Sequence, residues 1–186
     1  MKTLTILPAV ETPQLIVREI ELRDAAAFSG FMTQASYQRY ISMKLADDAE
    51  VKAFVARSVA RQGDERRNVF HLAAEEKSSG EAVGDGFIIA QRPDVLEIGW
   101  GVHPAMWALA IGTEIGRALL GLCFERLKAE RAWCKVMTAN QASARLARRI
   151  GMAHVRSNPD YPAGGGQFTT VDLYALKASD YFELSY

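Results

Sequence analysis

The segment from position 103 to 116, HPAMWALAIGTEIG, joins a strand-like run to a long helical run. A helix start presents unpaired backbone N–H groups and a partial positive charge, so it can hold an anion such as a pyrophosphate. Residues 108–113, ALAIGT, are small or uncharged and leave those amides open. Ala110 stands where such loops usually carry glycine, and alanine disfavours a positive φ by about 1 kcal/mol or more. The segment is compatible with anion binding, and an ordinary strand-to-helix corner explains the same residues.

The run before this segment, VLEIGWGV at 95–102, alternates as a strand. One face holds Leu96, Ile98, Trp100 and Val102. The other face holds Glu97, Gly99 and Gly101, and glycine inside a strand often marks a bulge or the close approach of a ligand. Glu97 is the only charge in this run, and we interpret it first as a surface glutamate at the edge of a sheet.

A second strand-to-helix junction follows at 132–150. The strand AWCKVMT runs into Asn140, a natural N-cap, and Ser143 falls in the first turn of the helix that follows. Gly151 is expected to end this helix as its C′ residue. Helix capping alone explains these residue types.

Length and composition restrict the class of protein. The 186 residues fit one domain, and 49% are hydrophobic, which is enough for a core without disulfides or metals. The 22 basic and 22 acidic residues balance, so no global charge directs the chain to nucleic acid or anionic lipid. Two cysteines without metal-ligand spacing and an N-terminus too polar for a secretory signal favour a cytoplasmic protein.

These junctions need a sheet to position them. We expect strands at 14–20, 69–76, 81–92, 95–102, 132–138, 152–157 and 170–177, and a loop at 158–168. We expect helices after Asp24, from Asp47 to about 62, at 111–129 and at 140–150. A strand–helix–strand unit at 95–138 makes part of the sheet parallel. The predicted fold is α/β (α+β mixed): one mixed, mostly antiparallel sheet of about seven strands with helices on both faces, in a single domain.

Three segments together match a known pattern. EIGWGVHPAMW, TEIGRALLGLCFERL and VMTANQASARLARRIGM resemble the GCN5-related N-acetyltransferases, in the branch that includes the ribosomal-protein N-terminal acetyltransferases. The most specific piece is the spacing of Asn140, Ser143, Gly151 and Met152. The resemblance spans about 13–177, which implies an acetyltransferase domain there with tails at 1–12 and 178–186.

The family resemblance implies transfer of an acetyl group from acetyl-CoA to a primary amine, without a metal. The strands matching 97–102 and 132–138 would splay, and the backbone of Trp100, Gly101 and Val102 would bind the pantetheine between them. Asn140 would touch the cofactor, and Ser143 could protonate the departing thiolate. The pyrophosphate would be held by the backbone N–H groups of Leu109, Ala110, Ile111, Gly112 and Thr113.

The resemblance leaves the base and the acceptor open. The carboxylates best placed by sequence are Glu97 and Asp160, the latter in the loop after the sixth strand. The acceptor would be a protein N-terminus or a small-molecule amine, bound mainly by the first two helices and the 158–169 segment. Neither nucleic acid nor a membrane is implied as a partner, and a homodimer is left open.

Two other functions differ in how well they fit the sequence. Ala110 in place of the family's loop glycine motivates a non-catalytic module of the same fold that binds an acyl-CoA or a peptide. A dinucleotide-binding enzyme does not fit, because no G-x-G-x-x-G sequence follows the first strand.

Overall fold

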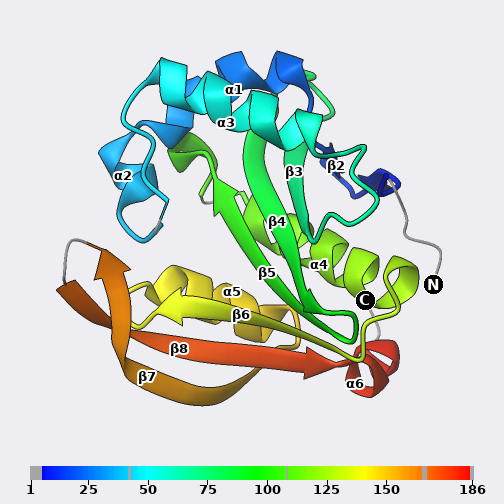
Figure 1. Ribbon diagram of the computed structural model, residues 1–186. Helices are drawn as coiled ribbons and strands as arrows, with labels where there is room; N and C mark the ends of the chain where they lie inside the picture. The colour runs from blue at the N-terminus through cyan, green and yellow to red at the C-terminus, as the bar shows by residue number, and fades with distance from the viewer. Residues whose placement is uncertain (1–5, 42, 108, 165–166, 185–186) are drawn as a thin grey trace.

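The computed structural model describes residues 6–41, 43–107, 109–164 and 167–184, which form one eight-stranded sheet with its helices (Figure 1). The strand order is β1-β2-β3-β4-β5-β6-β8-β7, and all neighbours pair antiparallel except β5 and β6. The strands are β1 (Val10–Glu11), β2 (Leu15–Glu19), β3 (Val69–Glu76), β4 (Ala82–Arg92), β5 (Val95–Val102), β6 (Arg131–Met137), β7 (Ala153–Gly164) and β8 (Gln167–Lys177). The predicted single, mixed and mostly antiparallel sheet is confirmed.

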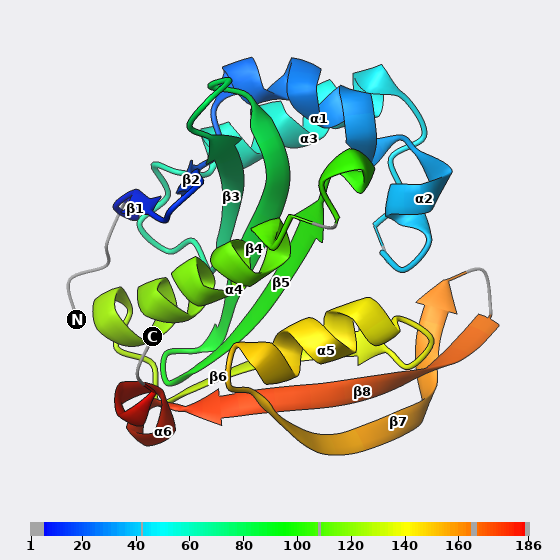
Figure 2. The same cartoon turned by 180° about the vertical axis from the view of Figure 1, so that it is seen from behind.

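Helices cover both faces of the sheet, as predicted (Figures 1 and 2). One face carries η1 (Leu22–Asp24), α1 (Ala25–Met32), α2 (Ala35–Gln38) and α3 (Asp48–Ala60). The other carries α4 (Ile111–Gly121), preceded by η2 (Pro104–Met106), and α5 (Gln141–Arg149). The last helix, α6 (Ala178–Glu183), follows β8.

Strand alternation divides the apolar residues between two cores. In β3, Leu72 and Ala74 enter the larger core beneath α4 and α5, whereas Ala73 enters the smaller core beneath α1 and α3. Residues of opposite parity in a strand point to opposite faces, so one strand can serve both cores. The sheet is therefore the middle layer of three.

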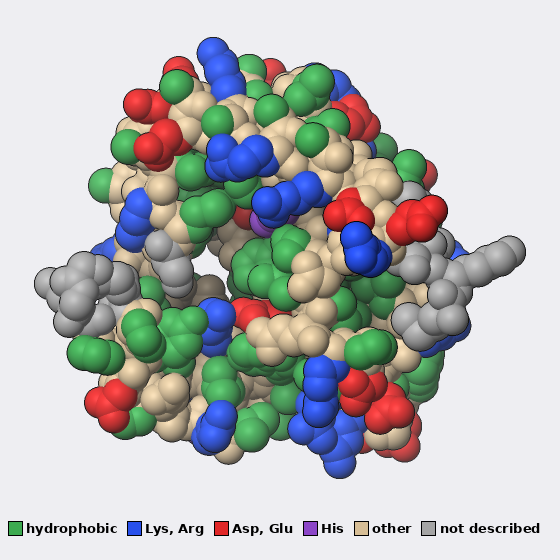
Figure 3. All heavy atoms as spheres, viewed as in Figure 1, with side chains coloured by type: hydrophobic (Ala, Val, Ile, Leu, Met, Phe, Trp, Pro, Cys, Tyr) green, Lys and Arg blue, Asp and Glu red, His purple; other side chains and the backbone are tan. Residues whose placement is uncertain are grey.

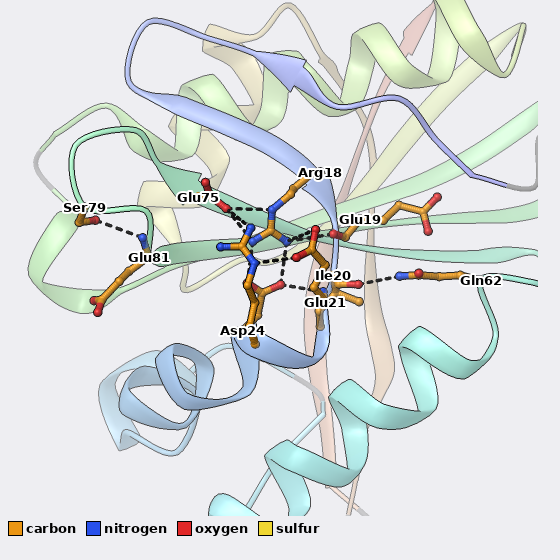
Figure 4. Close-up of polar contacts among 10 residues, drawn as sticks. Arg18, Glu19, Ile20, Glu21, Asp24, Gln62, Glu75, Ser79 and Glu81 are labelled. Atoms are coloured by element: carbon orange, nitrogen blue, oxygen red, sulfur yellow. Dashed lines mark hydrogen bonds and ion pairs between the residues drawn. The ribbon is translucent and has the colours of Figure 1, made fainter.

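A buried ionic network fixes α1 to the sheet (Figure 4). Arg18 of β2 donates to both Asp24 oxygens, at 2.8 and 2.7 Å, and its Nη2 also lies 2.7 Å from Glu75 of β3. Asp24 occupies the N-cap position of α1 as predicted, but its side chain makes no cap bond to that helix. It accepts instead from Arg18 and from the Glu21 amide, because the arginine is the stronger partner for a buried carboxylate.

The other predicted cap is confirmed. Asp47 accepts a 2.9 Å bond from the amide of Glu50 at the start of α3. Gly151 ends α5 with a left-handed φ of +92°, which suits a glycine at C′.

The helix predicted at 111–129 is wrong beyond position 121. The α-helix ends at Gly121 and continues as a π-helical segment, η3 (Leu122–Arg126). The Leu127 amide bonds to the Leu122 carbonyl, five residues earlier, at 2.9 Å. Helical periodicity in sequence does not distinguish this wider turn from an α-helical one.

The loop predicted at 158–168 is also wrong. Its described residues belong to β7 and β8, which pair as a long hairpin with register shifts at three places, one between Asn158 and Tyr161. Bulges of this kind let a strand carry prolines at 159 and 162 that would otherwise break a ladder. At the open side of the molecule, α2 lies across from the free end of this hairpin (Figures 1 and 2).

Candidate active site

The central feature of the site is the parting of β5 and β6. These parallel strands pair only where Val95–Glu97 meet Arg131–Trp133. Beyond that point β5 stays with β4 as far as Val102, and β6 stays with β8 as far as Met137. The splay implied by the family resemblance is thereby confirmed. The space-filling view shows an opening between the α1–α3 layer and the lobe of β6, β7 and β8 (Figure 3).

The start of α4 follows the open end of β5. Ala110, its N-cap, has φ +62° and ψ +4°, a left-handed conformation. The Leu109 and Thr113 amides already donate to the Met106 and Ala110 carbonyls, at 3.1 and 2.9 Å. No bond between described residues uses the amides of Ala110, Ile111 and Gly112. Three consecutive N–H groups at a helix start are suited to a diphosphate.

Trp107 connects this loop back to the strand. Its side chain is 60% exposed, and its Nε1 donates a 2.9 Å hydrogen bond to the Val102 carbonyl. The last carbonyl of β5 is therefore already bonded, which leaves the other backbone groups of the unpaired edge for a ligand.

Close packing against α5 fixes the direction of α4. A Cβ on Gly112 would lie 2.6 Å from Leu146 Cδ1, and one on Gly116 would lie 2.9 Å from Ile150 Cδ1. Real Cβ atoms do not approach so closely, so a side chain at either glycine would require the ends of the Leu146 and Ile150 side chains to shift. Gly112 thus serves helix packing in addition to its place in the predicted phosphate loop.

Asn140 and Ser143 lie at the start of α5, directly after β6. The Asn140 Oδ1 accepts a 3.2 Å bond from the Ser143 amide, which confirms the predicted N-cap. Capping uses the oxygen of the Asn140 amide. Its NH₂ group and the partly exposed Ser143 hydroxyl are the groups that could bond to a ligand.

Glu97 lies where the two strands part, and it is not a surface residue. It is only 2% exposed, and its Oε1 lies 2.7 Å from Lys135 Nζ of β6. Gln91 Nε2 donates to the other oxygen at 2.9 Å. The surface interpretation fails because the neighbouring strand supplies a cation, which the sequence around Glu97 does not reveal.

The two glycines of β5 leave room for protein side chains. A Cβ on Gly99 would clash with the ring of Phe87, and one on Gly101 would clash with the Tyr37 hydroxyl and an Asp85 oxygen. The close approach expected from these glycines is real, but the approaching groups come from β4 and α2 and not from a ligand.

Asp85 is a functional candidate that the sequence alone did not single out. It pairs with Gly101 in the β4–β5 register and accepts a short hydrogen bond from the Tyr37 hydroxyl of α2. Burial raises the pKa of Asp85 to about 6, although the hydrogen bond from Tyr37 lowers it. The signal in the sequence was a lone acid between Gly84 and Gly86 in an otherwise uncharged stretch of strand.

Asp160 lies in β7, near one of the register shifts of the hairpin. Its amide donates to Asn158 Oδ1 at 3.2 Å, a local turn-like bond. Its side chain is exposed to solvent.

Comparison with known proteins identifies the family. Residues 14–153 match the acetyltransferase (GNAT) domain family. The chain belongs to this family, and its activity is that of an acetyl-CoA-dependent N-acetyltransferase. Of the described residues, no helix is long and apolar enough to span a membrane, and no group of His, Cys, Asp and Glu side chains is placed to hold a metal ion.

Individual relatives agree. The chain is 27% identical over 148 residues to the N-acetyltransferase YoaA of Bacillus subtilis (strain 168), covering 78% of this chain and 83% of that one. Among solved structures it resembles a GNAT-family acetyltransferase from Bacillus anthracis, with a TM-score of 0.82, 18% identity and coverage of 92% of this chain and 99% of the other. It also resembles RimL, a ribosomal L7/L12 alpha-N-protein acetyltransferase solved with coenzyme A, with a TM-score of 0.77, 17% identity and coverage of 91% and 98%. The predicted family is confirmed, and the predicted branch is represented among these structures.

Proposed function

We propose that this acetyltransferase transfers the acetyl group directly to a primary amine in a ternary complex, with Asp85 as general base. The observation that carries the proposal is the open edge of β5. It runs from the parting of the strands at Glu97, past Gly101, to the start of α4, and Asp85 of the neighbouring strand β4 pairs with Gly101. The groups proposed to bind the cofactor therefore lie along β5, and the proposed base lies beside them on β4.

Acetyl-CoA fits the groups that line this edge. The amides of Ala110, Ile111 and Gly112 suit the diphosphate, and the stretch of β5 at Trp100 and Gly101, which no longer pairs with β6, suits the amide groups of the pantetheine. When bound, acetyl-CoA supplies a thioester activated toward attack. Backbone N–H groups of β5 aimed at the thioester oxygen would stabilise the charge that develops there.

The base is assigned on position and pKa. An amine must lose its proton before it attacks, and α-amino groups (pKa about 8) do so more readily than lysines at about 10.4. The Asp85 carboxylate lies over Gly101 of β5, and a pKa of about 6 leaves it ionised near neutral pH while keeping it a better base than an ordinary aspartate. It can accept the amine proton directly or through water.

Two residues at the start of α5 complete the proposed machinery. The Ser143 hydroxyl would give its proton to the departing thiolate, and the free NH₂ of Asn140 would contact the cofactor. Glu97 holds Lys135 at the base of the cleft, and Asp160 is exposed on β7, so both support the site less directly than Asp85 does.

We propose a protein N-terminus or a small-molecule amine as acceptor. RimL, whose fold this chain shares, is an alpha-N-protein acetyltransferase, which supports the first class. Both cysteines are free and buried, which supports the cytoplasm as its compartment.

The test combines binding with turnover. Acetyl-CoA at millimolar concentration should raise the melting temperature by mass action, and a panel of peptides and small amines should show release of free coenzyme A. Binding without turnover on any acceptor would favour the non-catalytic module instead. Absence of any thermal shift would remove both interpretations.

A further inference from the structure

The left-handed conformation of Ala110 needs an explanation in the structure. Its φ of +62° costs an alanine about 1 kcal/mol or more, and such strain persists only where the surroundings over-determine it. The family pattern places glycine at this position, where the conformation is free of that cost. Some contact outside the loop must therefore hold Ala110.

A set of hydrogen bonds from the turn between β1 and β2 provides that contact. Gln14 Nε2 donates to the Leu109 carbonyl at 3.2 Å and to Glu114 Oε1 at 2.7 Å. The Gln14 amide donates to Glu114 Oε2 at 3.0 Å, and the Thr12 hydroxyl makes a short bond to the same oxygen. One glutamine side chain thus bridges the residue before Ala110 and the fourth residue after it.

This turn is itself firmly placed. The Thr12 amide bonds to the Leu15 carbonyl at 2.9 Å, and the Lys77 amide, in the turn between β3 and β4, bonds to the Gln14 carbonyl at 3.0 Å. The turn is therefore tied to the sheet and not only to the loop, so it can act as a fixed support.

Glu114 is held as a carboxylate by donors of the β1–β2 turn. Burial raises the pKa of Glu114, but hydrogen bonds from Thr12 and Gln14 outweigh it, and the pKa lies below its ordinary value. The ionised carboxylate accepts three hydrogen bonds from the β1–β2 turn. Lys77 adds a favourable charge. The Glu114 carboxylate therefore takes its hydrogen bonds from the β1–β2 turn and not from the amides of the diphosphate-binding loop.

We infer that Thr12, Gln14 and Glu114 form a latch that positions the diphosphate-binding loop, replacing the missing glycine. The latch holds Ala110 in the left-handed conformation so that the amides of Ala110, Ile111 and Gly112 converge on one anion. These are positioning residues that act through the backbone of the loop. The inference rests on the proposed function, since it requires that acetyl-CoA be bound by those amides.

The test is a double-mutant cycle between Gln14 and Ala110. Gln14→Ala should weaken coenzyme A binding by calorimetry, and raise KM for acetyl-CoA, about five- to tenfold, with kcat changed less than about twofold. With Ala110→Gly alone, affinity should stay within about twofold, because the latch already holds the loop. In the Ala110→Gly background, Gln14→Ala should cost at most about twofold, because glycine adopts the conformation unaided.

The matched control is Gln62→Ala. Gln62 Nε2 donates to the Ile20 carbonyl at 2.6 Å, a glutamine-to-carbonyl bond of the same kind beside α3 (Figure 4). It should lower thermal stability at least as much as Gln14→Ala and leave coenzyme A affinity unchanged. This separates a general loss of stability from a loss of loop geometry.

Three outcomes overturn the inference. An unchanged affinity in Gln14→Ala removes the latch, and so does an equal loss in both backgrounds, because the effect would then not pass through Ala110. Failure of the wild-type protein to bind coenzyme A would overturn the proposed function itself, and the latch with it.

Discussion

The Tyr37 hydroxyl donates a hydrogen bond to the Asp85 carboxylate directly over Gly101, which has no side chain to obstruct them. Tyr37 belongs to α2, and its ring packs edge-on against the Phe31 ring, with the two ring centroids 5.1 Å apart. The bond that orients the proposed base therefore also holds the short helix beside the cleft. Chemistry and local packing depend on the same pair.

Removing the base should remove most of the activity. Asp85→Asn keeps an oxygen for Tyr37 but cannot take a proton, so kcat should fall about 100- to 10,000-fold, the usual contribution of general base catalysis. For wild type, kcat/KM should rise with pH through about 6 as Asp85 ionises, and this limb should vanish in the variant. Steady-state assays from about pH 5 to 9 measure both.

Two other carboxylates serve as comparisons for that prediction. Asp64→Asn changes an aspartate in an exposed turn, where it accepts a bond from the Arg66 amide, and should leave kcat unchanged. If Asp160→Asn abolishes turnover while Asp85→Asn keeps it, the base assignment to Asp85 is wrong.

The substitution Asp85→Asn should also stabilise the fold at neutral pH. The pKa of Asp85 is raised from 3.8 to about 6, so the folded state binds this proton more tightly than the unfolded chain does. Its contribution to the free energy of unfolding therefore falls as pH rises from about 4 to about 6 and is constant above. Asp85→Asn should gain about 1–3 kcal/mol at about pH 7.5 and nothing near pH 4. Urea unfolding at the two pH values checks this, and equal differences at both would contradict it.

Local patterns are sufficient to predict most of the fold. The strands at 69–76 and 95–102 have the predicted bounds in the structure, because strict alternation and flanking turns define them. Asn140 and Asp47 are predicted as caps from residue type and spacing, and both make the expected bonds. Signals carried by a few adjacent residues are thus reliable here.

Contacts between segments that are distant in the sequence cannot be predicted from local sequence patterns. Tyr37 and Asp85 are 48 positions apart, and Glu97 and its partner Lys135 lie on different strands. The burial of Glu97 could not be predicted because a strand pattern shows which face a residue takes but not what covers that face. Prolines and glycines at 159–166 indicate a loop, whereas bulges allow the described part of that segment to remain a strand.

Gly101 should be intolerant of even one methyl group. In Gly101→Ala the new Cβ displaces the Tyr37 hydroxyl and the Asp85 carboxylate, so kcat should fall at least about tenfold and stability by about 1–3 kcal/mol. Gly30→Ala is the matched control, because Gly30 lies in α1 with open space at its Cβ position. It should stabilise the protein by about 0.5–1 kcal/mol and leave kcat unchanged. Thermal unfolding and turnover of both variants measure this, and equal behaviour of the two would refute the steric argument.

The Glu97–Lys135 pair should respond unequally to removal of its two members. Glu97 is 2% exposed, whereas the Lys135 side chain is 30% exposed, so only the lysine can reach water when its partner is lost. The Lys135 Nζ also lies 5.4 Å from the centroid of the Tyr161 ring. Lys135→Met leaves a buried carboxylate with Gln91 as its remaining hydrogen-bond donor, and should cost about 3 kcal/mol or more. Glu97→Gln leaves a cation that can turn to solvent, and should cost about 1 kcal/mol.

The double variant determines whether the unpaired charge is the cause. In Lys135→Met/Glu97→Gln no buried charge is left at this site, and the new side-chain amide at position 97 can still bond to Gln91, so stability should recover to within about 1 kcal/mol of wild type. Guanidinium unfolding of the wild type and the three variants gives the coupling energy. If the double variant is as unstable as Lys135→Met, the loss comes from the contacts of the Lys135 ammonium group with the Trp133 and Tyr161 rings and not from the carboxylate. The ion pair would then not be what holds β5 and β6 together at the point where they part.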